Sequence, residues 1–132
     1  MPFSARAMRD SDWRSVRHFT PGEFKAPERM GWNFLLWLDQ VRDACGVPMR
    51  VTSSYRTPQH NAQVGGAKDS AHCDTPCNAV DLMPQNNYER WQIVTAAWAL
   101  GCRRVGIYSD GSIHLDMTHD VRPAPRLWVV GG

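Results

Sequence analysis

The stretch that decides the fold is "SAHCDTPCNAVDLM", residues 70–83, because it places His72 and Asp81 toward opposite ends of one loop. Asp81 lies inside the apolar run "AVDLM", residues 79–83, which predicts a buried β-strand. A carboxylate in such a strand is expensive to desolvate unless a cation or hydrogen-bond donors lie beside it. The stretch therefore predicts one half of a functional site.

The second half is predicted in "SIHLDM", residues 112–117. Side chains alternate between the two faces of a strand, so His114 and Asp116 share one polar face. The opposite face of this strand is apolar and carries Ile113, Leu115 and Met117. Together, His72, Asp81 and His114 form a set of two histidines and one carboxylate, which suits a catalytic zinc ion with an open fourth coordination position.

Hydrophobic periodicity predicts two long helices and a set of short strands. The helices are expected over residues 30–46 and 86–101, the second with Trp91, Val94, Ala97 and Trp98 on one apolar face. The strands are expected within residues 47–55, 78–83, 103–109, 112–117 and 126–130. The turn at residues 109–111 would join two strands as a hairpin, and short helices are expected at residues 20–24 and 57–66. This pattern predicts an α+β fold with a small, mainly antiparallel sheet flanked by helices.

Length and charge narrow the class of protein. The chain of 132 residues fits one domain spanning residues 1–132, with residues 1–20 as an irregular N-terminal arm. Its formal net charge is +2 and its basic residues are scattered, which argues against nucleic-acid binding. No apolar run approaches the roughly 18 residues that a membrane span needs, and no signal peptide is recognised. We therefore expect a soluble chain made in the cytoplasm, which would need another exit route to act outside the cell.

Four cysteines fall into two classes. Cys45 and Cys102 lie near the ends of apolar helical patterns and are expected to be buried thiols. Cys73 and Cys77 flank a short loop, where they would be free, disulfide-linked in an oxidising compartment, or metal ligands. A structural zinc cluster is disfavoured because no second cysteine pair is present. A cysteine hydrolase that uses Cys73 beside His72 is also disfavoured, because adjacent residues rarely present their side chains to each other.

Three blocks of the sequence carry a resemblance to a known family. They are "VTSSYRTPQHN" at residues 51–61, "SAH" followed by "NAVDLM" within residues 70–83, and "GIYSDGSIHLDM" at residues 106–117. In order and context they resemble the zinc D-alanyl-D-alanine carboxypeptidases and L-alanyl-D-glutamate endopeptidases, a family that includes phage endolysins and shares a fold with the Hedgehog signalling domain. The resemblance extends from about Pro21 to Trp128.

This resemblance implies three zinc ligands, which are His72, Asp81 and His114. It also implies that Arg56 lies near the substrate's carboxylate or carbonyl, where its permanently charged fork would bind anionic oxygens. Independently of the resemblance, Ser54 and Ser70 are candidates for hydrogen bonds to the substrate or the ligands, and Tyr108 for lining the cleft; the alternative is that they are strand-end and turn residues without a role in the site. His60 and His119 have no matching carboxylate, so both are expected at the surface.

The sequence departs from the family's pattern in two places. The family's spacing H-x-x-G-x-A-x-D becomes "HCDTPCNAVD" at residues 72–81, which is two residues longer and lacks the glycine. The glutamate that many members carry three residues before the final histidine is replaced by Gly111. Another group must then transfer the proton, and Asp116 is the first candidate for this catalytic role, with Asp110 the second. Asp116 would alternatively orient a ligand histidine.

The family likeness implies a zinc-dependent peptidase that hydrolyses a peptide bond in the stem peptides of bacterial peptidoglycan. The bond would be that of a D,D-carboxypeptidase or of an L-Ala-D-Glu endopeptidase. Such an enzyme would act on the cell wall as a phage lysis enzyme after holin release, or from the virion beside other virion proteins. The alternative is a catalytically inactive structural or binding module of the same fold, which the missing glutamate and the longer loop favour.

Overall fold

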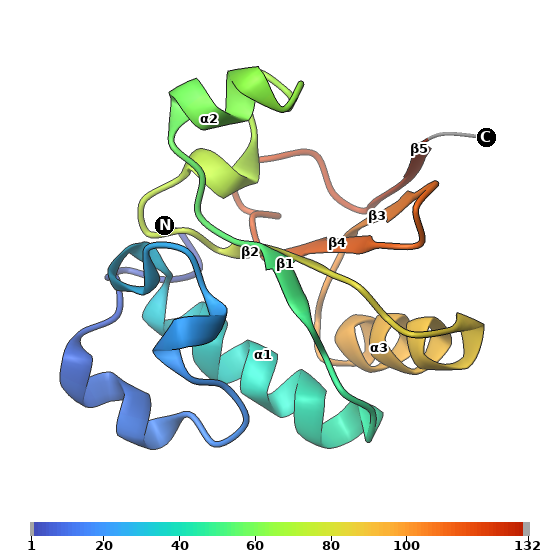
Figure 1. Cartoon of the computed structure of the whole chain (residues 1–132), viewed down its shortest axis with the longest axis horizontal. Helices are drawn as coiled ribbons and strands as arrows, with labels where there is room; N and C mark the ends of the chain where they lie inside the picture. Colours follow the sequence, from blue (N-terminus) through green and yellow to red (C-terminus); the bar gives the residue numbers. More distant parts are fainter. Residues whose placement is uncertain (1, 131–132) are drawn as a thin grey trace.

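The structure is a computed structural model that describes residues 2–130, and it confirms the α+β fold (Figure 1). The helices are α1 (Trp32–Cys45), α2 (Pro58–Gln63) and α3 (Asn87–Ala99), with short 3-10 turns η1 (Asp10–Ser15), η2 (Pro21–Glu23), η3 (Pro27–Arg29) and η4 (Ala71–Cys73). The strands are β1 (Val51–Ser53), β2 (Ala79–Leu82), β3 (Arg104–Tyr108), β4 (Ile113–Asp116) and β5 (Arg126–Val130).

The five strands form one sheet in the order β1-β2-β4-β3-β5. Every neighbouring pair is antiparallel except β3 and β5, which run parallel, so the sheet is mainly antiparallel as predicted. The predicted hairpin joins β3 to β4, and Gly111 in its turn has a φ of +93°, a conformation that favours glycine. β5 lies at the edge of the sheet, as its position after two prolines predicts.

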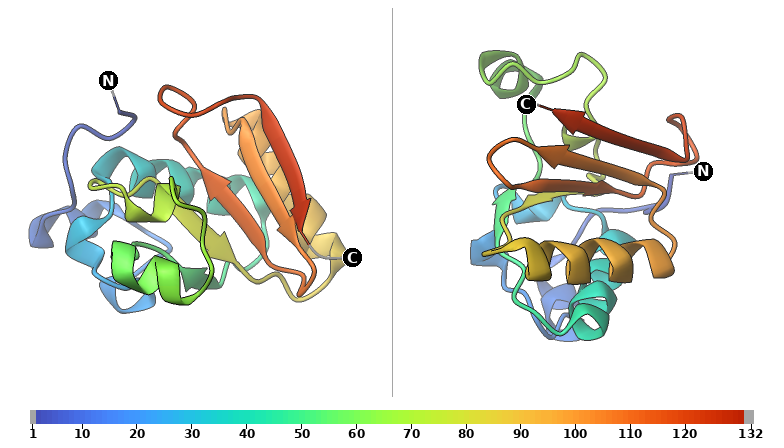
Figure 2. Two further views of the ribbon diagram at one scale, coloured as in Figure 1. Left: turned by 90° about the horizontal axis from the view of Figure 1, so that it is seen from above. Right: turned by 90° about the vertical axis from the view of Figure 1, so that its right-hand side faces the viewer.

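Helices cover the two faces of the sheet unequally. In the right-hand view of Figure 2, α3 and then α1 lie below the sheet, while α2 lies above it. The core is formed between α1 and the lower face by fully buried side chains, among them Phe34, Leu35, Leu38, Val80, Leu82, Ile113 and Leu115. The apolar residues of β4 therefore point toward α1 and α3, which leaves the polar face of the sheet for the site.

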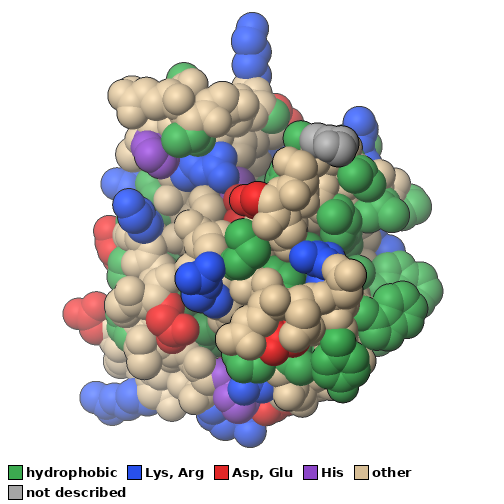
Figure 3. Space-filling view, turned by 45° about the vertical axis from the view of Figure 1, so that its right-hand side comes forward, with side chains coloured by type: hydrophobic (Ala, Val, Ile, Leu, Met, Phe, Trp, Pro, Cys, Tyr) green, Lys and Arg blue, Asp and Glu red, His purple; other side chains and the backbone are tan. Residues whose placement is uncertain are grey.

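The predicted apolar face of the second helix is correct for Ala97 and Val94, which pack in or against the core, and wrong for the two tryptophans. Trp91 and Trp98 are 66% and 60% exposed, and the residues of α3 that pack into the core are Ile93 and Ala97. The small side chain of Ala97 suits a close approach to α1, and the guanidinium of Arg103 lies 4.9 Å from the Trp98 ring. Figure 3 shows hydrophobic side chains gathered at the right of that view, over α3 and β5.

Two other expectations differ in extent. The strand expected within residues 47–55 is limited to β1, although the carbonyl of Arg50 before it still accepts a backbone hydrogen bond from Met83. The segment before α1, expected as an irregular arm, contains the 3-10 turns η1, η2 and η3 and packs into the core through Met8, Val16 and Phe19. Within residues 2–130, no helix is long and apolar enough to cross a membrane.

Candidate metal centre

Three side chains from separate elements converge on the polar face of the sheet. His72 comes from η4, Asp81 from β2 and His114 from β4, and all three are buried. The carboxylate Oδ1 of Asp81 lies 3.2 Å from His72 Nε2 and 3.0 Å from His114 Nδ1. The two imidazole nitrogens lie 3.2 Å apart. One ligand atom from each residue therefore faces a common point.

Local structure fixes each of these positions. Asp81 and His114 lie directly opposite each other in the antiparallel β2–β4 pair, so their side chains project together from one face. Ser70 caps η4 by accepting a hydrogen bond from the His72 N–H at 3.2 Å, which begins the single turn that carries the histidine. The extra residues of the longer loop lie within residues 73–78, and the side chains of His72 and Asp81 remain in contact.

The outer nitrogens of both histidines are held by acceptors. His72 Nδ1 donates to the backbone carbonyl of Ser54 at 2.7 Å, and His114 Nε2 donates to Asp116 Oδ2 at 2.7 Å. In the neutral tautomers that these bonds fix, the lone pairs of His72 Nε2 and His114 Nδ1 point toward Asp81. Three electron-pair donors at such distances repel one another unless a positive charge lies between them.

This donor set fits zinc. A tetrahedral zinc ion with bonds of about 2.0–2.1 Å has its ligand atoms about 3.3 Å apart, close to the spacings of 3.0–3.2 Å in the cluster. The set of two imidazoles and one carboxylate is also one that catalytic zinc sites use. Hydrogen bonds to the outer nitrogens would then hold both rings in the orientation that ligation requires.

Electrostatics favour a cation at the same point. Burial raises the pKa of Asp81, but hydrogen bonding with His114 and His72 outweighs burial and holds that pKa below its usual range. Burial lowers the pKa of His114, but Asp116 and Asp81 have the larger effect and raise it. Asp81 is therefore ionised at neutral pH. Arg56 lies beside its Oδ2, and beside its Oδ1 a metal ion would take the place of a proton on one of the histidines.

Asp116 is fully buried and turned away from the centre of the cluster. Its Oδ2 accepts from His114, while its Oδ1 accepts from the Thr118 hydroxyl at 2.6 Å and from Arg104 Nε at 2.9 Å. Burial raises the pKa of Asp116, but its hydrogen bond with His114 and the other groups around it lower the pKa to about 2. Both oxygens are thus occupied, which is the geometry of a carboxylate that orients a histidine.

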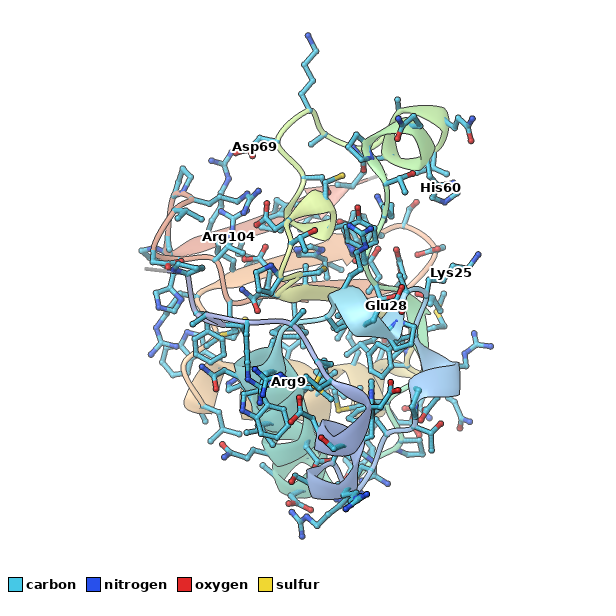
Figure 4. All side chains as sticks on the ribbon, turned by 90° about the vertical axis from the view of Figure 1, so that its left-hand side faces the viewer. Arg9, Lys25, Glu28, His60, Asp69 and Arg104 are labelled. Atoms are coloured by element: carbon cyan, nitrogen blue, oxygen red, sulfur yellow. The ribbon has the colours of Figure 1, made fainter. Side chains whose placement is uncertain are left out.

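The remaining predicted site residues line a cavity of about 400 Å³ next to the cluster. Arg56, Ser70 and Tyr108 all form part of its wall, together with His72 and His114. The Arg56 guanidinium donates to Asp81 Oδ2 at 3.1 Å, and also to Ser53 and Asn61. Figure 4 shows Asp69 on the loop after α2 and Arg104 on the sheet, two further residues of this wall.

Asp110 lies on the β3–β4 turn and lines an adjoining cavity that it shares with Asp81 and Arg56. It is exposed, and its Oδ1 accepts from the Ser112 hydroxyl at 2.6 Å. Hydrogen bonds from Ser112 lower the pKa of Asp110, so this carboxylate is ionised at neutral pH. It is the second of the two predicted candidates for proton transfer.

The other histidines and the cysteines lie outside the cluster. His60 and His119 are exposed, as predicted, and Figure 4 shows His60 on α2, away from the sheet. Cys45 and Cys102 are buried, also as predicted. Cys73 and Cys77 are free thiols, and burial raises the pKa of Cys77 to about 12, which makes this thiol a poor nucleophile or ligand.

The cleft residues that sequence reasoning missed include Asp69, Arg104 and, on β5, Arg126 and Trp128. The indole of Trp128 reaches the cluster, with its ring centroid 5.3 Å from that of His114. One signal was present in the sequence: residues 126 and 128 alternate along a strand, so they share a face. The sequence does not say which face of the sheet they share, because that depends on how β5 pairs with β3, an earlier strand of the chain.

Comparison with known proteins gave one match. A family model described as Peptidase M15 matches residues 11–116, a segment that includes all three members of the cluster. No match was found among curated proteins or among solved structures.

Proposed function

This chain belongs to the peptidase M15 family of zinc metallopeptidases, and from that premise we propose that it hydrolyses a peptide bond in the stem peptides of bacterial peptidoglycan. The observation that carries the proposal is the convergence of His72, Asp81 and His114 at the wall of a cleft that also contains Arg56. We assign the cleft to a peptide because its arginine, serine and tyrosine side chains match the polar groups of a peptide backbone and carboxylate.

The three residues of the cluster would hold the zinc ion. When bound, zinc supplies a Lewis acid that activates water and polarises the scissile carbonyl. Arg56 then donates to an oxygen of the substrate, because its guanidinium is always charged and its donors form a rigid fork. Bonds to Ser53, Asn61 and Asp81 fix this fork before the substrate arrives, so little entropy is lost when it binds.

We assign proton transfer to Asp110 rather than to Asp116. Asp116 borders the cavity beside the cluster, but its side chain is fully buried and both of its oxygens already accept hydrogen bonds from protein groups. Asp110 is exposed, is ionised, and lines one cavity with Asp81. The hydrogen bonds from Ser112 hold only Oδ1 of Asp110, which leaves Oδ2 to accept a proton and pass it to the leaving amine.

Asp110→Asn should lower kcat by about 100-fold or more, the usual contribution of a general base, while the zinc content per chain stays unchanged. Asp120→Asn is a matched control, because Asp120 is an exposed aspartate that lines a different cavity. Turnover and metal content should be measured on the same preparations. Unchanged turnover in Asp110→Asn would remove this residue from the proton-transfer role.

We place the activity in a phage setting, because the three sequence blocks are similar to those of phage endolysins. The enzyme would be made in the cytoplasm and would reach the cell wall after holin release, or it would act from the virion beside other virion proteins. In either setting the substrate is the same stem peptide.

The decisive experiment is mass spectrometry of purified peptidoglycan after incubation with the zinc-loaded protein, beside a chelator-treated control. We expect products that depend on zinc. Release of D-alanine identifies a D,D-carboxypeptidase, and a stem peptide cut after L-alanine identifies an endopeptidase. An unchanged digest from protein that contains one zinc ion per chain would instead support the inactive structural or binding module.

A further inference from the structure

One row of paired residues crosses the sheet and ends at Trp128. Asp81 pairs with His114, His114 with Gly106, and Gly106 with Trp128. Residues paired across a sheet project from the same face, so Trp128 lies on the face of the metal centre. Gly106 supplies no side chain between them, and a Cβ placed there would lie 2.5 Å from Trp128 Nε1. The glycine therefore leaves the space through which the indole reaches His114.

The neighbouring row places two arginines beside this tryptophan. Asp116 pairs with Arg104, and Arg104 with Arg126. Arg104 is engaged: it donates to Asp116 and to the carbonyl of Pro123 at 2.6 Å, and its guanidinium lies 5.3 Å from the Trp128 ring. The side chain of Arg126 has no hydrogen bond or ion pair with any other residue in the range 2–130. Arg126 thus carries an uncommitted positive charge.

Arg126 and Trp128 border the same cavity as His72 and His114. Arg56 lines that cavity too, but three of its five N–H donors are already engaged with Asp81, Ser53 and Asn61, whereas Arg126 has its whole fork available for a carboxylate. A cation without an internal partner can bind an anionic ligand group without first breaking a bond within the protein. The segment that matches the family model ends at residue 116, so β5 and both of these residues lie beyond it.

We propose that Arg126 and Trp128 form a substrate subsite beside the metal centre, which takes a free carboxylate of the peptide next to a small aliphatic side chain. This inference rests on the proposed function and extends it to substrate selection. The guanidinium binds a carboxylate through two parallel hydrogen bonds. The face of the indole gives a rigid apolar surface for a methyl group. Stem peptides offer both chemistries, in their carboxylates and in their alanine side chains.

The test uses two probe peptides, the stem pentapeptide with its carboxylates free and the same peptide with every carboxylate converted to a carboxamide. In the wild-type protein, amidation should lower kcat/KM by about 10-fold or more, as expected for the loss of a hydrogen bond to a charged group. Arg126→Gln should abolish most of this preference, and Arg126→Lys should retain part of it. Trp128→Ala should raise KM for both peptides while the zinc content stays near that of the wild type.

Two variants serve as controls. Arg103→Gln removes the same charge on the α3 side of the sheet, where Arg103 contacts Trp98. Leu127→Ala changes an exposed residue on the opposite face of β5. Both should keep the preference for the free carboxylate. The proposal is overturned if the wild-type protein cleaves both peptides equally, or if Arg126→Gln keeps the full preference.

Binding calorimetry with the same two peptides separates this proposal from the proposed function. If no preparation cleaves either peptide, the proposed function fails, and the binding data decide the subsite. Tighter binding of the free-carboxylate peptide to the wild-type protein than to Arg126→Gln would support the subsite. Equal binding, or no binding, would overturn it.

Discussion

Replacing His114 by alanine should remove most of the bound zinc and, with it, the hydrolysis of peptidoglycan. His114 Nδ1 lies 3.0 Å from Asp81 Oδ1 and 3.2 Å from His72 Nε2, so its loss leaves only two of three donor atoms. We expect the zinc affinity to fall by more than about 100-fold, beyond the range of 10–100-fold that is usual for residues that only support a ligand. Metal analysis after dialysis against buffered zinc measures this loss directly.

Because His114 is buried, its removal also risks destabilising the fold. Asp81→Asn supplies a second variant, since it keeps the size of the side chain but removes the anionic ligand. The thermal unfolding of both variants, measured without metal, shows whether each one still folds, so that a loss of zinc binding can be distinguished from a loss of the fold. His60→Ala is the control, because His60 is exposed on α2. A full complement of zinc in folded His114→Ala would overturn the assignment of this ligand.

Replacing Asp116 by alanine should weaken zinc binding by about 10–100-fold, because His114 then loses the acceptor that orients its ring. It should also destabilise the fold by about 3–5 kcal/mol, since the largely buried guanidinium of Arg104 is left without its carboxylate. A general base at this position predicts a different result, in which zinc remains bound and only hydrolysis is lost. Chelator competition and urea unfolding therefore distinguish the two roles.

A double variant separates the two effects of Asp116. Arg104→Gln combined with Asp116→Asn removes both charges of the buried pair, so much of the lost stability should return. Zinc affinity should remain weak, because an amide at position 116 is a poorer acceptor for His114 than a carboxylate. If the double variant recovers full zinc affinity, the carboxylate of Asp116 has no orienting role.

The parts of the molecule that the sequence predicted are those that local patterns determine. Strict alternation in residues 112–117 predicted β4 and its polar face, and the turn before it predicted the hairpin. The apolar run around Asp81 predicted β2 and a buried carboxylate. These two strands are neighbours in the sheet, so His114 and Asp81 lie side by side. The charged residue within an apolar run was the sequence signal that indicated the site.

Other features depend on contacts that no local pattern contains. Helical spacing placed Trp91 and Trp98 on one apolar face with Ala97, yet only Ala97 of these three is buried, beside Ile93, which the spacing did not select. The position of Trp128 follows from the parallel pairing of β5 with β3, which joins segments that are distant in the chain. The environment of Asp116 likewise depends on Arg104 across the hairpin and on Thr118 beyond the strand.

The close approach of Trp128 to Gly106 has a consequence for how such sequences diverge. Any side chain at position 106 would occupy the space of the indole, so the glycine is tolerant of change only after the tryptophan has become smaller. In an evolving sequence, a substitution of Trp128 is therefore expected before any substitution of Gly106. Descendants of an ancestor with this pair should inherit both residues together or have lost the tryptophan.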